Sequence, residues 1–191
     1  MARERKFSLE DLFQTTKQLL LDYGYEGFTF SLLADQLHVA RGTLYKYYEN
    51  KDELISAYMV YELKQVLLKL KQIDQIESFE SQFDFLITLI FSHNDLQHFI
   101  AIVHQIPKET NEKVKANKEQ LEKLHLDMYS LLQDFIALGR EEKVLKETIP
   151  DGLILGFIFQ TVAIPNHFGV PHKEWVESIK HIISHGMFTN N

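Results

Sequence analysis

Residues 24–54 of the chain read GYEGFTFSLLADQLHVARGTLYKYYENKDEL. The pattern predicts two short helices that are joined by a tight turn. The second helix presents Arg41, Thr43, Tyr45, Lys46 and Tyr47 within seven residues. A short helix with such outward side chains is typical of the helix that enters the major groove of DNA. This stretch therefore has more functional specificity than any other part of the sequence.

Local signals place the helix ends in this stretch. Thr29 is suited to cap the start of a helix expected over 30–37. A turn follows at His38, and the next helix is expected over 40–47. A further helix is expected over 51–73, because acidic residues favour its first turn and neither proline nor glycine interrupts it.

The flanking sequence is also predicted to be helical. Ser8, with Asp11 three residues later, is a capping signal for a helix that Gly24 is expected to end. Gly139 is expected to end a long helix, and Pro150 stands where another can begin. The remaining helices are expected over 78–92, 95–104, 108–139, 150–164 and 173–187.

The composition favours an all-α protein, and the helices expected along the chain number about nine. The chain has 191 residues, of which 45% are hydrophobic, so it can bury a sizeable core. It has no cysteine, which excludes disulfides and thiolate metal sites. No signal peptide is recognisable, and the longest apolar stretch, 152–165, is too short to span a bilayer. We therefore expect a cytoplasmic protein without a membrane segment.

The net charge of −7 is unevenly distributed. Residues 1–51 carry seven basic and seven acidic side chains, whereas residues 52–191 carry 13 basic and 20 acidic ones. The local field, and not the total charge, determines whether a phosphate backbone is attracted. A neutral first segment and an acidic remainder fit a protein that meets DNA at one end only.

The side chains of the second short helix suit DNA recognition chemically. Thr43, Lys46 and the tyrosine hydroxyls can bond phosphates or base edges, and Arg41 can donate two hydrogen bonds to guanine. Gly42 lacks a side chain, so the backbone can come close to the duplex. Lys51 adds its charge to the exposed amides at the start of the next helix, where anions bind readily. The alternative is a helical hairpin with solvated polar side chains.

Residues 24–54 resemble the DNA-binding segment of the TetR family of transcriptional regulators. The matching residues are Gly24, Tyr25, Thr29, Ala34, Val39, Gly42, Thr43, Leu44, Tyr45, Tyr47, Tyr48, Lys51, Asp52, Glu53 and Leu54. The close match covers residues 24–54, and the rest of the chain matches in helix number and length. The resemblance implies an all-α homodimer that binds double-stranded operator DNA and a small-molecule effector, without a cofactor.

The resemblance also implies a division of labour along the chain. Residues 1–50 would form a three-helix helix-turn-helix DNA-binding domain, and residues 51–191 a larger helical ligand-binding and dimerisation domain. The implied DNA-contacting residues are Thr29, Arg41, Gly42, Thr43, Tyr45, Lys46, Tyr47 and Lys51.

Three residues depart from the family's usual pattern. His38 stands where glycine is usual in the turn, and histidine adopts a left-handed conformation at some cost. Ala40 stands where serine often caps the recognition helix, which removes a cap worth about 1 kcal/mol. Tyr48 replaces a usual phenylalanine and needs a partner for its hydroxyl group.

Ligand pockets of the family lie among the helices after the fourth. The candidate ligand-binding residues here are Phe83, Phe91, Phe99, Tyr129, Phe157 and Phe159, with His104, Gln160 and Thr161 as polar contacts. An apolar cavity with a few polar groups would suit a hydrophobic effector. The alternative for each of these residues is an ordinary place in the core.

The last two helices are the expected dimer interface. Gly152 and Gly156 lie four residues apart and allow close helix approach. The apolar side chains expected around them or on the facing helix are Ile149, Leu153, Phe157, Ile164, Trp175, Ile179, Ile182 and Ile183. Paired helices from two chains would form a four-helix interface. The alternative is packing within one chain.

The remaining motifs favour neither a metal site nor an enzyme. His181 and His185 have a spacing at which two imidazoles can share a metal, and His167 and His172 are near in sequence. No recognisable set of carboxylate or cysteine ligands accompanies them, so surface or interface histidines are expected. No nucleophile elbow, phosphate-binding loop or zinc-protease motif occurs.

The sequence thus predicts a ligand-responsive repressor that a small hydrophobic effector releases from a palindromic operator. The helix over 51–73 would carry the effector signal to the DNA-binding segment. The alternatives are a helical ligand carrier or enzyme whose first segment only packs, and a DNA-binding adaptor without an effector.

Overall fold

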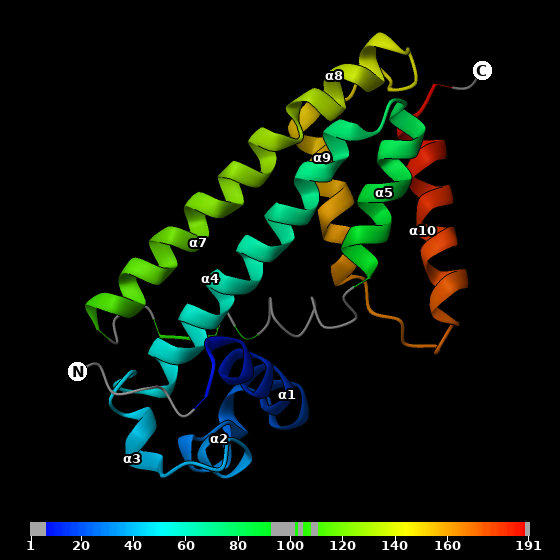
Figure 1. Cartoon of the computed structure of the whole chain (residues 1–191). Coiled ribbons are helices and arrows are strands. Elements are labelled where there is room, and N and C mark those ends of the chain that lie inside the picture. The colour runs from blue at the N-terminus through cyan, green and yellow to red at the C-terminus, as the bar shows by residue number, and fades with distance from the viewer. Residues whose placement is uncertain (1–6, 93–101, 103–104, 108–110, 190–191) are drawn as a thin grey trace. The chain divides into compact units, whose positions relative to one another are not determined.

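The computed structural model describes residues 7–92, 102, 105–107 and 111–189. Within these residues every regular element is a helix, apart from one isolated antiparallel bridge between Leu145 and Phe188 (Figure 1). The predicted all-α class is therefore confirmed. No helix in the described ranges is both long and apolar enough to span a membrane.

The described part of the chain contains nine α-helices and two 3-10 helices. They are α1 (Leu9–Gly27), α2 (Phe30–Gln36), α3 (Arg41–Leu44), α4 (Lys51–Leu70), η1 (Lys71–Gln75), α5 (Phe79–Phe91), α7 (Glu112–Leu131), α8 (Gln133–Glu141), α9 (Asp151–Gln160), η2 (Thr161–Ala163) and α10 (His172–Met187). Nearly all of the helix expected over 95–104 lies outside the described residues.

Several of the predicted helix ends are wrong. The helix expected over 108–139 divides at Leu132, whose backbone leaves helical geometry at φ −95° and ψ 6°. Gly139 does not end this region, because it lies inside α8. The helix expected over 150–164 ends as α9 at Gln160, and the chain then tightens into η2.

The described residues fall into two compact units. The first comprises those within Met1–Lys64 and His98–Lys123, and the second those within Gln65–Gln97 and Leu124–Asn191. Helices α4 and α7 each contribute residues to both units. Each unit has its own hydrophobic core.

Helix α1 of the first unit begins with the predicted cap. The Ser8 hydroxyl accepts a hydrogen bond from the Asp11 amide (2.9 Å), and the Asp11 carboxylate accepts one from the Ser8 amide (3.0 Å). The hydrogen bonds from Ser8 lower the pKa of Asp11. Gly24 interrupts the helix at φ +65°, a conformation that glycine adopts without strain. Leu12, Leu20 and their neighbours on the apolar stripe are buried.

A buried carboxylate organises the start of α4 in the first unit. The Asn50 side chain caps the helix by accepting a hydrogen bond from the Glu53 amide (2.9 Å). The Glu53 carboxylate, whose side chain is 4% exposed, accepts hydrogen bonds from the Glu49 amide (3.0 Å) and the Lys113 ammonium (2.7 Å). Asn111 also donates to this carboxylate (3.4 Å). The beginning of α7 is thereby tied to the residues that follow α3.

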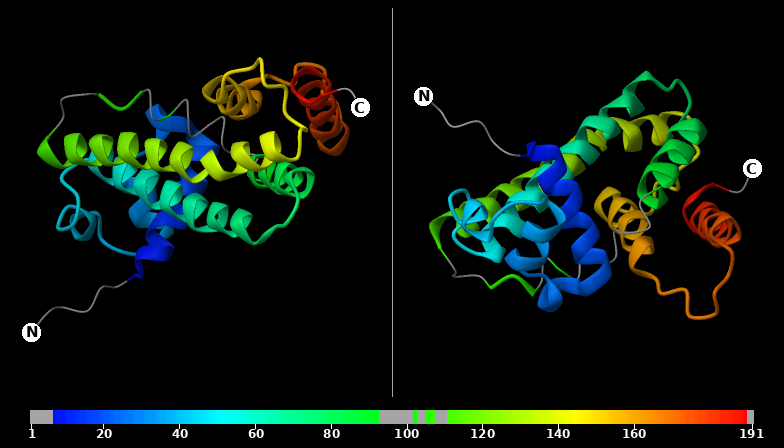
Figure 2. Two further views of the ribbon diagram at one scale, coloured as in Figure 1. Left: turned by 90° about the horizontal axis from the view of Figure 1, so that it is seen from above. Right: turned by 60° about the horizontal axis from the view of Figure 1, so that its bottom comes forward.

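Aromatic rings form the centre of the second unit. Phe79 of α5 stacks on Phe135 of α8, with ring centroids 4.7 Å apart, and contacts Phe188 edge-on at 5.4 Å. Phe83 meets Phe188 at 5.2 Å. These contacts join α5 to α8 and to the end of α10, and Figures 1 and 2 show α5 alongside α10.

The residues expected at the dimer interface lie on or beside α9 and α10, some of them in the core and others on the surface. Ile179 and Ile183 are buried in the core of the second unit, so their expected place in an intersubunit stripe is wrong. Leu153 and Phe157 of α9 are 59% and 43% exposed, and Ile182 of α10 is 61% exposed. A Cβ atom on Gly152 would meet nothing within 4 Å.

Candidate nucleic-acid interface

A compact turn joins α2 to α3. The hydroxyl of Thr29 accepts a hydrogen bond from the Leu32 amide (3.2 Å), which confirms the predicted cap of α2. At the other end, the amide of Val39 donates to the carbonyl of Ala34 (2.9 Å) and that of His38 to Asp35 (3.2 Å). This pair of bonds is the Schellman motif, which requires a left-handed residue after the helix. His38 occupies that place with φ 53°.

We expect His38→Gly to raise the free energy of unfolding by up to about 1 kcal/mol, because the left-handed conformation strains a residue that has a Cβ atom. Urea denaturation at equilibrium measures the change. DNA affinity should stay the same, since the turn keeps its hydrogen bonds.

Lys143 provides a matched control in the second unit. It follows α8 with φ 58°, and the amides of Lys143 and Val144 donate to Arg140 and Gly139 in the same motif. Lys143→Gly should therefore give a similar gain in stability. A loss of stability in both variants would contradict the strain argument.

The recognition helix is shorter than predicted. Helix α3 contains four residues, Arg41–Leu44, whereas the sequence predicts a helix over 40–47. The amide of Lys46 donates to Thr43 (3.3 Å) and that of Tyr47 to Leu44 (2.9 Å), so the chain continues as tighter turns. Ala40 occupies the N-cap position of α3 and makes no side-chain hydrogen bond there, as expected because alanine has no hydroxyl group.

Four of the candidate DNA-contacting residues are exposed on and after α3. Arg41, Gly42 and Lys46 are exposed, and Tyr45 is 45% exposed. A Cβ atom on Gly42 would meet nothing within 4 Å, so the backbone there is accessible to a partner. Buried Leu44 anchors the opposite face in the core of the first unit. The segment thus presents cations, an aromatic hydroxyl and open backbone together.

Three further candidates lie at the edges of this surface. Thr29 is exposed at the start of α2, and its hydroxyl oxygen is used in the cap. Thr43 is half-buried. Tyr47 is also half-buried and meets Phe7 edge-on, with ring centroids 5.9 Å apart. A packing role for Tyr47 therefore accompanies its predicted DNA contact.

Lys51 belongs to a cluster that joins α1 to α4. Its ammonium donates to the carbonyl of Tyr25 (2.9 Å) and lies 4.1 Å from the centre of that ring. The Tyr25 hydroxyl donates to the carboxylate of Asp52 (2.5 Å). Burial, and then the hydrogen bond to Asp52, raises the pKa of Tyr25. The Lys51 ammonium has three N–H donors, and the hydrogen bond to Tyr25 uses one of them, so this bond leaves donors for a phosphate. The DNA contact of Lys51 stays a prediction.

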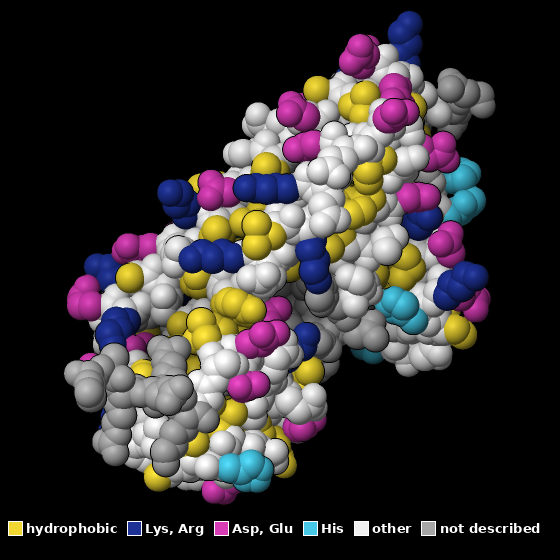
Figure 3. Space-filling view, viewed as in Figure 1, with side chains coloured by type: hydrophobic (Ala, Val, Ile, Leu, Met, Phe, Trp, Pro, Cys, Tyr) yellow, Lys and Arg dark blue, Asp and Glu magenta, His cyan; other side chains and the backbone are white. Residues whose placement is uncertain are grey.

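On the face seen in Figure 3, basic and acidic side chains are interspersed. The described side chains on this face therefore form no broad basic patch. The basic residues Arg3, Arg5 and Lys6 lie outside the described ranges.

The candidate ligand-binding residues have different environments. Phe83 and Phe91 are buried, and Tyr129 is half-buried against Phe159, with ring centroids 5.6 Å apart. The buried hydroxyl of Thr161 donates to the carbonyl of Ile158 (2.6 Å). The remaining candidates are exposed or undescribed: Phe157 and Gln160 are exposed, and Phe99 and His104 lie outside the described residues.

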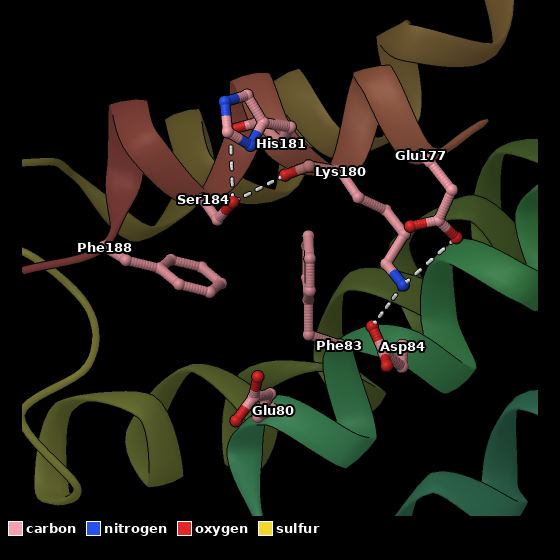
Figure 4. Close-up of a pocket in the computed structure, with 8 residues that line it drawn as sticks. All are labelled: Glu80, Phe83, Asp84, Glu177, Lys180, His181, Ser184 and Phe188. Carbon is pink, nitrogen blue, oxygen red and sulfur yellow. Dashed lines mark hydrogen bonds and ion pairs between the residues drawn. The ribbon is translucent and has the colours of Figure 1, made fainter. Parts of the chain in front are cut away.

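A groove of about 420 Å³ lies between α5 and α10 (Figure 4). Its lining residues are Glu80, Phe83, Asp84, Glu177, Lys180, His181, Ser184 and Phe188. Phe83 is the one candidate ligand-binding residue in this lining. The ammonium of Lys180 pairs with Asp84 (2.8 Å) and Glu177 (3.7 Å), and the hydrogen bond to Asp84 raises the pKa of Lys180. The groove is therefore more polar than the pocket expected for a hydrophobic effector.

The histidines do not form a metal centre within the described residues, where no group of three or more potential ligands has suitable geometry. His181 and His185 lie with ring centroids 3.9 Å apart on α10. The Nδ1 atom of His185 is 2.9 Å from the carbonyl oxygen of His181. Both side chains are exposed.

The contacts that support this surface from behind were not predicted from the sequence. Phe30 packs against Tyr45 with ring centroids 5.0 Å apart, and Lys113 bonds to the buried Glu53 carboxylate from a distant part of the chain. The i, i+4 spacing of Arg41 and Tyr45 was a local signal for their observed hydrogen bond. No local signal links Lys113 to Glu53.

Comparison with protein families gives one match, to the bacterial regulatory proteins of the tetR family, over residues 12–58. This range contains α2, α3 and the turn between them, together with the start of α4. A comparison with curated protein sequences gave no match.

Solved structures share the fold along the whole chain. FadR from Bacillus subtilis, in complex with stearoyl-CoA, has a TM-score of 0.69 and 19% identity, over 94% of this chain and 99% of that one. KstR2 from Mycobacterium tuberculosis, a ketosteroid transcriptional regulator, has a TM-score of 0.69 and 14% identity, over 100% and 98%. A Saccharomonospora viridis protein in complex with choline has a TM-score of 0.76 and 14% identity, over 95% and 97%.

Proposed function

Because the chain belongs to the TetR family of bacterial transcriptional regulators, we propose that it is a repressor that binds a near-palindromic operator as a homodimer and that a small hydrophobic effector releases it. Membership of this family makes the protein a DNA-binding regulator and not an enzyme. The repressor role, the dimer and the effector are the parts that the proposal adds.

One observation carries the DNA-binding part of the proposal. Residues 41–47, within the segment that matches the family, present Arg41, Tyr45 and Lys46 to solvent next to an open glycine backbone. The proposed contacts are Thr29, Arg41, Gly42, Thr43, Tyr45, Lys46, Tyr47 and Lys51. We assign operator binding to residues 1–50, and effector binding and dimerisation to residues 51–191.

The outward apolar side chains of α9 and α10 support the homodimer. Leu153 and Phe157 lie one turn apart on α9, and Ile182 lies on α10, each with a large exposed fraction. Exposed apolar groups of this kind favour association with a partner. A two-fold dimer would place two copies of α3 in successive major grooves, about 34 Å apart. A near-palindromic operator follows from that symmetry.

The aromatic side chains after α4 support a hydrophobic effector. The proposed contacts are Phe83, Phe91, Phe99, His104, Tyr129, Phe157, Gln160 and Thr161. Among proteins of the same fold, Bacillus subtilis FadR is in complex with stearoyl-CoA, which has a long apolar chain, and another protein is in complex with choline. An effector releases DNA when it binds more tightly to a conformer that fits the operator poorly.

Selection of bound sequences from random duplexes, repeated with a panel of fatty acyl compounds, sterols and quaternary amines, tests the proposal. We expect an enriched near-palindrome, and at least one compound that lowers affinity for it. Failure to enrich any sequence would contradict operator binding and favour a ligand carrier. Enrichment that no compound reverses would favour a DNA-binding adaptor without an effector.

A further inference from the structure

Arg41 is exposed, yet its guanidinium group is held in place. Its Nη2 atom donates a hydrogen bond to the Tyr45 hydroxyl oxygen (2.7 Å), four residues along the chain. Its central carbon lies 5.3 Å from the centre of the Tyr45 ring. One partner thus contacts the group through both a hydrogen bond and the ring, which restricts a side chain that is otherwise among the most flexible.

The Tyr45 ring is itself fixed from behind. It meets Phe30 of α2 edge-on, with centroids 5.0 Å apart and an angle of 60° between the planes. Phe30 is 4% exposed and belongs to the core of the first unit. A continuous series of contacts therefore connects the core, through Phe30 and Tyr45, to the guanidinium group on the surface.

This arrangement leaves the guanidinium able to recognise a planar partner. Arginine has five N–H donors, and the hydrogen bond to Tyr45 uses one of them. Two parallel donors in a planar fork match the O6 and N7 acceptors of guanine, and the flexible point charge of lysine is not equivalent to that fork. A fork that is already ordered loses less entropy when it binds.

We propose that Arg41 reads a guanine in the major groove of each operator half-site, and that Tyr45 and Phe30 are positioning residues that aim its guanidinium group at the base edge. The inference rests on the proposed operator binding and adds a base identity to it. Arg41 is the first residue of α3, and the first residues of a recognition helix are those that meet base edges.

Lys46 provides the contrast on the same surface. It is exposed, and its ammonium is a point charge that suits a phosphate in any sequence. Loss of a phosphate contact weakens binding to all sequences alike and lowers the salt dependence, whereas loss of a base contact changes the preference at one position. The two roles are therefore separable in one assay.

The experiment begins with selection from random duplexes by the full-length protein. The affinity for half-sites in which one base pair at a time is changed is then measured at several salt concentrations. The variants are Arg41→Lys, Arg41→Ala, Tyr45→Phe and, as the matched control, Lys46→Ala. We expect Arg41→Lys to lose about tenfold or more of the discrimination for guanine at one position, with an unchanged salt slope. Tyr45→Phe, which keeps the ring, should lose about three- to tenfold at the same position.

Lys46→Ala should keep the guanine preference and lower the salt slope by about one unit. The inference would be overturned if Arg41→Lys kept the wild-type preference at every position, or if Arg41→Ala lowered affinity uniformly together with the salt slope. Tyr45→Phe with undiminished discrimination would overturn the positioning role. Wild-type protein that enriches no sequence would overturn the proposed function as well, so the two failures are distinguishable.

Discussion

Gly139→Ala is expected to lower the free energy of unfolding by about 2 kcal/mol, although alanine is the better helix former. A Cβ atom at this position would lie 2.6 Å from two ring carbons of Phe79 and 2.7 Å from a methyl carbon of Leu145. Phe79 is fully buried and stacked on Phe135, so its ring has no free space to enter. Overpacking of this kind costs about 3 kcal/mol, and helix propensity offsets about 1 kcal/mol of it.

Gly186→Ala is the matched control. Gly186 lies in α10, and a Cβ atom there would meet nothing within 4 Å. It should therefore gain up to about 1 kcal/mol from helix propensity alone. Chemical denaturation of the two variants at equal protein concentration measures both changes. Equal stabilisation by the two substitutions would refute the close packing of Phe79 on Gly139.

The role of Gly139 is not determined by the residues near it in the sequence. A glycine followed by polar residues is the usual signal for a helix end, so the sequence predicts that the helix stops there. The structure instead places Lys143 in the left-handed position after α8 and leaves Gly139 in the helix. Whether a glycine ends a helix or admits a neighbouring ring depends on a contact between residues 60 positions apart. Local pattern carries no information about such a contact.

The start of the chain was more predictable because its signals are local. The Ser8–Asp11 cap, the Thr29 cap and the left-handed His38 each depend on residues within five positions of one another, and each is confirmed. The outward side chains of α3 follow from helical spacing in the same way.

The contacts that brace this segment were not predictable from the sequence. Tyr25 bonds to Asp52, and Lys113 bonds to Glu53, across 27 and 60 residues respectively. Phe30 reads as an ordinary core residue, so its role behind Tyr45 appears only when α2 and α3 are packed together. Nonlocal packing therefore determines how rigidly the candidate site is held, whereas local pattern identifies which residues it contains.

Simultaneous substitution of Leu153 and Phe157 by glutamate is expected to reduce operator affinity by about a hundredfold or more. Both side chains are exposed on one face of α9, so the folded subunit should tolerate the change. Four buried charges at a two-fold interface would prevent the two subunits from associating. A single subunit contacts one half-site, and the advantage of linked binding, about 10² or more, is then lost. Sedimentation and operator titration measure the two effects on the same sample.

Leu126→Glu separates an interface effect from a general effect of added charge. Leu126 lies on α7 and is 66% exposed, comparable to Leu153. This variant should remain a dimer and bind the operator with wild-type affinity, since nothing in the proposed interface is changed. The double variant should still bind a single half-site as weakly as a wild-type subunit would, because α3 is intact. If the double variant remained dimeric, α9 would not be the interface.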